Sequence, residues 1–157
     1  MEELQRLLYK RQTVLLGIGR RNHGDDAAGP LLAEKIGKHK FITGLICEEL
    51  TENYTDIVQA LRPQTVLLSD AVDFKGQPGQ VVLMKADDLN ATTVSAHHAS
   101  LQPLMRYLEM TTGGEVRLLG IQPAALVPGT GTSRSVNDTI EMLRSLLLKV
   151  GIDEEET

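Results

Sequence analysis

The chain has 157 residues, enough for one α/β domain with a sizeable core, and its 41% apolar but only 3% aromatic residues predict an aliphatic core. Its net charge is −5 and the sequence contains no basic patch, which argues against nucleic-acid binding. No apolar run approaches the ~20 residues needed to span a bilayer, and the charged opening stretch Met1–Arg11 is unlike a signal peptide, so we expect a cytoplasmic protein that does not bind membranes.

Apolar runs and turn residues divide the first half of the chain into alternating helices and strands. Short helices are predicted where apolar residues have helical spacing or where a proline suits a first turn: Met1–Arg11, Pro30–Gly37 and Thr55–Leu61. Buried strands are predicted where the apolar run is uninterrupted: Thr13–Ile18, Leu45–Cys47 and Thr65–Asp70. A loop rich in glycine and aspartate, Gly19–Gly29, follows the first strand.

The fourth predicted strand, Gln80–Lys85, should run against the others. The connection from Asp70 passes through the turn residues Gly76–Gly79. Parallel pairing needs a crossover of about a dozen residues or more, and fewer are available, so this strand is expected to be antiparallel to the third. The remaining predicted elements are a helix, a strand and a long amphipathic helix: Ser100–Met110, Val116–Gly120 and Ser135–Val150.

This alternation of strands and helices predicts the fold class. We expect an α/β three-layer sandwich, in which a twisted, mostly parallel five-stranded sheet with one antiparallel strand carries helices on both faces. The sequence has no internal repeat or linker, so residues 1–157 are expected to form a single domain. The acidic residues 153–157 are expected to be a frayed, solvated tail.

Polar residues follow two of the predicted strands at their carboxyl ends, where open α/β sheets form their sites. Asp26 lies in the loop after the first strand, and Asp70 ends the third. If these strands are parallel neighbours, the two carboxylates project from one edge, which costs free energy unless a cation offsets it. About a dozen residues separate Lys85 from His97, enough at ~3.3 Å each to return along a strand of ~17–20 Å. The sequence therefore allows an Asp26–Asp70–His97 site for a divalent metal.

Each of these residues also has a purely structural interpretation. Asp25 or Asp26 would hydrogen-bond loop amides before the helix, Asp70 would be a loop carboxylate at a strand end, and His97 and His98 would precede a helix. Other catalytic arrangements are less well supported. Cys47 is the only cysteine, so neither a disulfide nor a CxxC site is available, and no GxSxG turn is present.

The loop and several later segments together resemble one family. Gly19–Pro30, following an apolar strand, is similar to the opening motif of the hydrogenase maturation endopeptidases. Further segments fall in the order of that family: Asp56-Ile57-Val58, Leu61-Arg62-Pro63, Leu68-Ser69-Asp70-Ala71, Pro78-Gly79, the His97 segment ending in Leu101, and Leu119-Gly120-Ile121-Gln122-Pro123. The last of these most resembles the branch that processes hydrogenase 3.

The resemblance implies an activity and a site. The family removes the C-terminal tail of a nickel–iron hydrogenase large-subunit precursor that already carries its metal centre, and its metal-contacting residues fall on Asp26, Asp70 and His97. Two oxygens and an imidazole nitrogen suit nickel or zinc. The resemblance implies that the substrate supplies the nickel, so the enzyme need not hold a tightly bound metal. We also expect the enzyme to be a monomer. The general base stays open among Asp73, His98 and Glu52.

The chain also departs from the family pattern, and two alternative functions stay open. Arg20 stands where the family usually has Asn, Ala27 where it has Gly, and Glu48–Asn53 lacks the family's glycines and proline. A catalytically silent relative that binds the precursor without cutting it fits these changes. A dinucleotide-binding module fits Gly17-x-Gly19, but Gly24 comes two residues late and the adjacent aspartates oppose a pyrophosphate.

Overall fold

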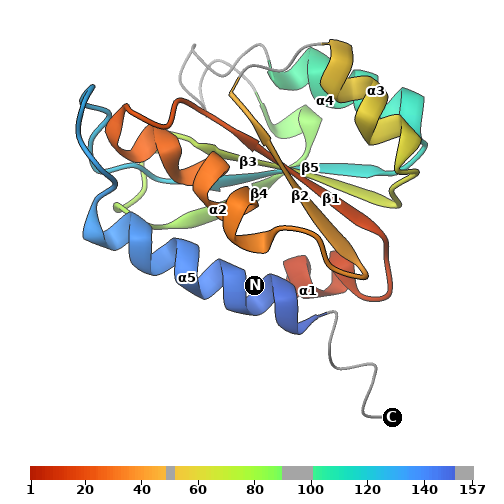
Figure 1. Cartoon of the computed structure of the whole chain (residues 1–157), viewed down its shortest axis with the longest axis horizontal. Coiled ribbons are helices and arrows are strands. Elements are labelled where there is room, and N and C mark those ends of the chain that lie inside the picture. Colours follow the sequence, from red (N-terminus) through yellow and green to blue (C-terminus); the bar gives the residue numbers. More distant parts are fainter. Residues whose placement is uncertain (49–51, 90–100, 151–157) are drawn as a thin grey trace.

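Five strands form one sheet in the order β2-β1-β3-β5-β4 (Figure 1). The structure is a computed structural model that describes residues 1–48, 52–89 and 101–150. β1 pairs in parallel with both β2 and β3, β3 pairs in parallel with β5, and β4 is antiparallel to β5. The strands are β1 (Thr13–Ile18), β2 (Ile42–Cys47), β3 (Thr65–Ala71), β4 (Val81–Met84) and β5 (Glu115–Ile121).

Helices cover both faces of this sheet, which confirms the predicted α/β three-layer arrangement (Figure 1). One face carries α1 (Glu2–Leu8), α2 (Ala28–Ile36) and α5 (Arg134–Lys149), and the other carries α3 (Glu52–Ala60) and α4 (Leu101–Thr112). Two short 3-10 helices, η1 (Gly24–Ala27) and η2 (Ala86–Asp88), follow β1 and β4. No helix in the described part of the chain is both long and apolar enough to cross a membrane.

The core is aliphatic, as predicted, and the alternation of side chains along each strand divides it into two layers. Leu15 of β1 and Leu67 of β3 face α1, α2 and α5. Their neighbours Leu16 and Leu68 face α3 and α4. All four side chains are fully buried. Each strand of the sheet interior therefore contributes to both layers, which explains its uninterrupted apolar sequence.

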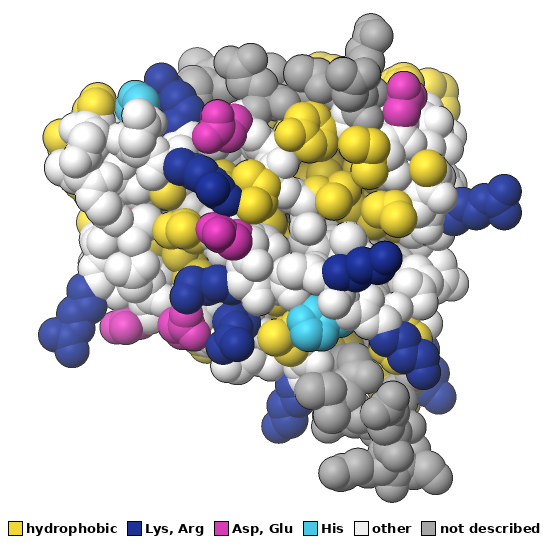
Figure 2. All heavy atoms as spheres, viewed as in Figure 1, with side chains coloured by type: hydrophobic (Ala, Val, Ile, Leu, Met, Phe, Trp, Pro, Cys, Tyr) yellow, Lys and Arg dark blue, Asp and Glu magenta, His cyan; other side chains and the backbone are white. Residues whose placement is uncertain are grey.

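The edge of the sheet formed by β2 also carries apolar side chains. β2 is an edge strand, and its middle four residues are only partly buried. Figure 2 shows hydrophobic side chains gathered on the side of the molecule where β2 lies, between α2 and α3, with charged side chains of both signs around them. The charges of the described residues are thus interspersed on this side.

The differences from the predicted elements lie mainly at their boundaries. The helix predicted from Pro30 begins at Ala28, and η1 occupies part of the predicted loop. A proline fits any position in a first turn, because amides there have no intrahelical partner, so Pro30 marked the turn but not its first residue. β2 begins at Ile42, earlier than predicted, because Gly44 interrupts the apolar run. β4 runs antiparallel to β3 as predicted, and its hydrogen-bonded neighbour is β5.

A close helix–strand contact holds the start of α2 on the sheet. A Cβ added to Gly29 would lie 2.1 Å from the carbonyl oxygen of Ser69 in β3 and 2.4 Å from that of Ile18 in β1. Only glycine permits this approach. The contact places η1, which immediately precedes α2, at the carboxyl ends of β1 and β3.

Candidate functional site

Two predicted site residues, Asp26 and Asp70, come from neighbouring elements at the carboxyl ends of the strands. Asp26 lies in η1, and η1 packs against β3. Asp70 is the next-to-last residue of β3 and only 3% of it is exposed. β1 and β3 are parallel neighbours, which is the condition on which the two-carboxylate prediction rested. We call the segments Gly19–Ala27 and Asp70–Gly76 the carboxyl rim; His97 and His98 lie outside the described residues.

The carboxylate of Asp26 is held by the loop that precedes it. The backbone N–H of Arg20 donates to Asp26 Oδ2 at 2.9 Å, and the Arg20 Nε lies 3.5 Å from the same oxygen. The Asp26 side chain is only 13% exposed, while that of Arg20 is 59% exposed. The carboxylate is therefore largely buried and contacts a guanidinium group whose side chain extends into solvent.

Asp25, the neighbour of Asp26, has a structural role. Its buried carboxylate accepts four hydrogen bonds: Ser133 N to Oδ1 (2.6 Å), and Ser133 Oγ (2.9 Å), Ala124 N (2.8 Å) and Ala125 N (3.2 Å) to Oδ2. Ser133 is also the N-cap of α5, where its Oγ accepts from Val136 N. Asp25 thus ties η1 to the start of α5 and to the chain that follows β5. The structural interpretation, a carboxylate that hydrogen-bonds loop amides, fits Asp25 in full, and the contact with the Arg20 N–H gives Asp26 part of the same role.

The same carboxylate opposes the dinucleotide-binding alternative. A pyrophosphate needs free backbone amides at the turn before the first helix. In this chain the turn is η1. Asp25 in this turn is 1% exposed, and its carboxylate accepts hydrogen bonds from Ala124, Ala125 and Ser133. Asp26 adds a second negative charge. A bound pyrophosphate would have to approach these two carboxylates.

Gln122 organises the other half of the carboxyl rim. Its Oε1 accepts from the backbone N–H groups of Phe74 and Gly76, each at 3.0 Å, and its Nε2 donates to Asp73 Oδ1 at 3.2 Å. The hydrogen bond from the Lys75 N–H, and then that from Gln122, hold the pKa of Asp73 below its usual value. A carboxylate with a lowered pKa is a weaker base, so Asp73 is poorly suited as the general base. The side chains of Glu52 and His98 lie outside the described part.

Cys47 does not compete as a nucleophile. Its side chain is completely buried at the end of β2, and burial raises the pKa of the thiol to about 11. The reactive thiolate is therefore scarce at neutral pH.

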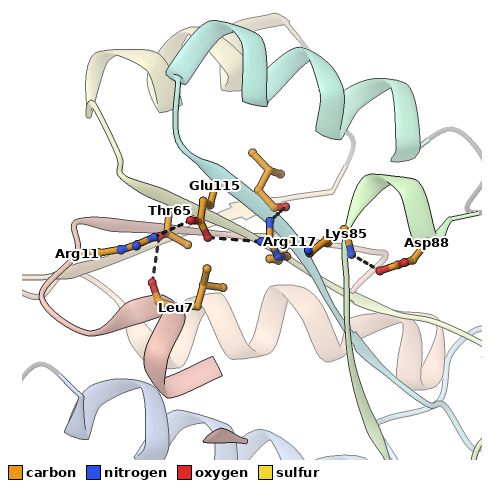
Figure 3. Close-up of polar contacts among 8 residues, drawn as sticks. Leu7, Arg11, Thr65, Lys85, Asp88, Glu115 and Arg117 are labelled. Atoms are coloured by element: carbon orange, nitrogen blue, oxygen red, sulfur yellow. Dashed lines mark hydrogen bonds and ion pairs between the residues drawn. The ribbon is translucent and has the colours of Figure 1, made fainter. Parts of the chain in front are cut away.

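A second group of charged side chains lies at the end of the sheet opposite to the carboxyl rim. Three arginines and two glutamates line a hollow of about 240 Å³, which we call the amino hollow; its lining is Glu3, Arg6, Leu7, Arg11, Leu83, Glu115 and Arg117. Figure 3 shows the centre of this network, where Glu115 pairs with Arg11 at 3.2 Å and with Arg117 at 3.5 Å. These charges largely compensate one another and lie at the amino ends of β3 and β5, away from Asp26 and Asp70.

The comparisons with known proteins identify the family. The hydrogenase maturation protease family matches residues 44–150. The hydrogenase 3 maturation protease of Escherichia coli K12 is 33% identical over 82% of this chain and 83% of its own length. A crystal structure of a [NiFe] hydrogenase maturation protease from Thermococcus kodakarensis superimposes with a TM-score of 0.85 at 28% identity, over 94% of this chain and 97% of that one. The solution structure of the endopeptidase HycI from Escherichia coli gives 0.76 at 30% identity, over 87% and 88%.

The chain belongs to the hydrogenase maturation protease family. It is therefore an endopeptidase, a hydrolase that acts on a peptide bond, as the resemblance implied. The matched residues 44–150 include Asp70 but begin after the loop that holds Asp26.

Two structural roles at the carboxyl rim were missed from the sequence. The sequence assigns no function to Gln122, which lies in a segment similar to the family, yet its side chain binds two amides and a carboxylate across the rim. The contact between Arg20 and Asp26 was missed as well. A signal existed in both cases: a polar residue directly after a buried strand, and an arginine six positions from a predicted ligand in a tight loop.

Proposed function

We propose that the chain is a metal-dependent endopeptidase that removes the C-terminal tail of a nickel-loaded large-subunit precursor of a nickel–iron hydrogenase. Asp26, Asp70 and His97 are its proposed metal-contacting residues. The observation that carries the proposal is the packing of η1 on β3 beside the parallel β1–β3 pair, which brings two carboxylate-bearing elements to one rim of the sheet. Membership of the maturation protease family supports the choice of substrate.

The chemistry of the proposed donor atoms suits a divalent ion. Two carboxylates and an imidazole form a mixed oxygen and nitrogen set of the kind that nickel or zinc accepts. Among residues 1–48, 52–89 and 101–150, no three His, Cys, Asp or Glu side chains are grouped as metal ligands. Asp26 and Asp70 therefore need His97, or groups carried by the precursor, to complete the set. This requirement agrees with a nickel ion that arrives as part of the substrate.

The contribution of the protein in this proposal is to fix the carboxylates and to shape the rim. The N–H of Arg20 orients the Asp26 carboxylate, and the pairing of β3 with β5, in which Asp70 lies opposite Gly120, fixes Asp70. Asp25 and Gln122 hold the flanking segments in place. A divalent ion held there by Asp26, Asp70 and His97 would supply Lewis-acid activation of the scissile carbonyl and of a water molecule.

The test is cleavage of the nickel-loaded precursor by single variants, followed by mass spectrometry of the large subunit. Asp26→Asn, Asp70→Asn and His97→Ala should each lower the rate more than about a hundredfold, since even residues that only orient metal ligands cost 10–100-fold. Asp87→Asn is the control, because this carboxylate is 80% exposed and pairs only on the surface with Arg106.

Unfolding in urea separates a lost site from a lost fold. Asp26→Asn is the decisive variant, because its side chain makes few contacts and the protein should stay folded. Full cleavage by folded Asp26→Asn, Asp70→Asn and His97→Ala proteins would refute the proposed site.

A further inference from the structure

Arg20 contacts the proposed ligand Asp26 in two ways that differ in strength. Its backbone N–H donates to Asp26 Oδ2 at 2.9 Å, and its Nε lies 3.5 Å from that same oxygen. The backbone contact is built into the loop: Gly19 has φ +139°, and a Cβ there would lie 2.0 Å from the Asp26 carbonyl oxygen. The guanidinium contact depends only on a flexible side chain.

The position of this guanidinium matters for a metal ion. Asp26 is exposed on only a small part of its side chain, whereas the Arg20 side chain is largely in solvent. The guanidinium that contacts Oδ2 thus belongs to a side chain that extends into solvent. A free divalent cation that approaches Oδ2 meets a like charge and has to displace it.

We propose that Arg20 is a specificity residue that occupies the Asp26 carboxylate in the resting enzyme and discriminates against free divalent ions. An ion presented by the precursor brings its own ligands and binding surface, and this additional binding displaces the side chain. Arg20 acts through Asp26, so the inference rests on the proposed function of that carboxylate.

The adjacent arginine provides a matched control. Arg21 pairs with Glu34 at 3.3 Å, and both side chains are about half exposed. The two arginines have the same charge and stand next to each other in the chain, but only Arg20 contacts Asp26.

The test measures the affinity of the full chain for free Ni²⁺ by isothermal titration calorimetry, without substrate. Arg20→Gln keeps the backbone N–H but removes the charge, and it should tighten Ni²⁺ binding about tenfold, the effect of one charge roughly 5 Å from a divalent ion in a water-like dielectric with some screening by salt. Arg21→Gln should change the affinity less than about twofold, because its charge is compensated by Glu34 and it makes no contact with Asp26.

A second variant shows whether the effect passes through Asp26. In the Asp26→Asn background, Arg20→Gln should no longer tighten binding. Equal affinities for wild type and Arg20→Gln, equal gains for both arginine variants, or no binding by Arg20→Gln up to millimolar Ni²⁺ would each overturn the inference. Loss of cleavage in Asp26→Asn together with any of these results would refute the role of Arg20 and leave the proposed function intact; unimpaired cleavage in Asp26→Asn would refute Asp26 as a ligand.

Discussion

The carboxyl rim and the amino hollow lie at opposite ends of the same strands, but their carboxylates are compensated by different kinds of group. In the amino hollow, Glu115 is paired with two arginine side chains, and the Glu115 and Arg11 side chains are 47% and 37% exposed. At the carboxyl rim, Asp25 is almost completely buried and accepts three of its four hydrogen bonds from backbone amides. The amino hollow compensates charge with exposed side chains, whereas the rim holds its carboxylates mainly by backbone N–H groups, with the Arg20 guanidinium as a second contact to Asp26.

This difference decides what each end contributes. Exposed pairs are screened by solvent and are worth little, whereas hydrogen bonds from the backbone to a buried carboxylate are strong and keep a fixed geometry. Backbone N–H groups fix the positions of Asp25 and Asp26, and the Arg20 guanidinium near Asp26 belongs to a largely exposed side chain that a further cation can displace. The rim therefore has the properties that a site requires, and the hollow those of an ordinary surface. Four predictions follow this contrast from the largest effect to the smallest.

Replacement of Asp25 should have the largest effect on stability. Asp25→Ala leaves four donors at the start of α5 and after β5 without their acceptor. Because hydrogen bonds to charged groups are worth about 1.5–3 kcal/mol each and water replaces some of them, the expected loss is about 3–4 kcal/mol in urea unfolding. Asp26→Ala, the matched variant one residue away, should cost only about 1 kcal/mol. Equal losses in the two variants would contradict the division of roles between the two aspartates.

Gly29→Ala tests the contact that positions η1. The added Cβ would overlap two strand carbonyls, so α2 and η1 have to move away from the sheet. We expect a loss of about 3 kcal/mol and a large drop in cleavage, because Asp26 moves with η1. Gly131→Ala is the control, since a Cβ there meets nothing within 4 Å. Cleavage by Gly29→Ala at the wild-type rate would show that the site tolerates displacement of η1.

Cys47 gives a prediction for alkaline pH. The pKa of the buried thiol is raised from 9.0 to about 11, so between these values the folded chain holds a proton that the unfolded chain has lost. Stability should therefore fall as pH rises through this window, by about 2 kcal/mol at pH 11. Unfolding measured from pH 8.5 to 11 should show a steeper decline for wild type than for Cys47→Ala. Parallel curves for the two proteins would mean that the thiol ionises equally in both states.

The fold was largely predictable from the sequence, and the polar contacts were not. Apolar runs such as Thr13–Ile18 revealed the central strands because both faces of these strands are buried, and the short connection after Asp70 correctly gave the direction of β4. The sequence did not show that β1 and β3 are neighbours; this was the condition on which the Asp26–Asp70 site depended, and the structure meets it. The roles of Asp25 and Gln122 depend on partners 99 and 49 residues away in the chain, and spacing within a motif carries no information about such distant contacts.

The smallest expected effect is that of Glu115→Gln in the amino hollow. The variant removes the one carboxylate shared by Arg11 and Arg117, but all three side chains reach solvent to some extent. Water and salt compensate the two guanidinium groups there, so the loss in urea unfolding should stay within about 1 kcal/mol, and the cleavage rate should not change. Because Arg117 is the most buried of the three, at 17% exposure, Arg117→Gln should have the larger effect of the two. A loss above about 2 kcal/mol, or impaired cleavage, in Glu115→Gln would mean that charge at this end of the strands is coupled to the rim, and the contrast between the two regions would fail.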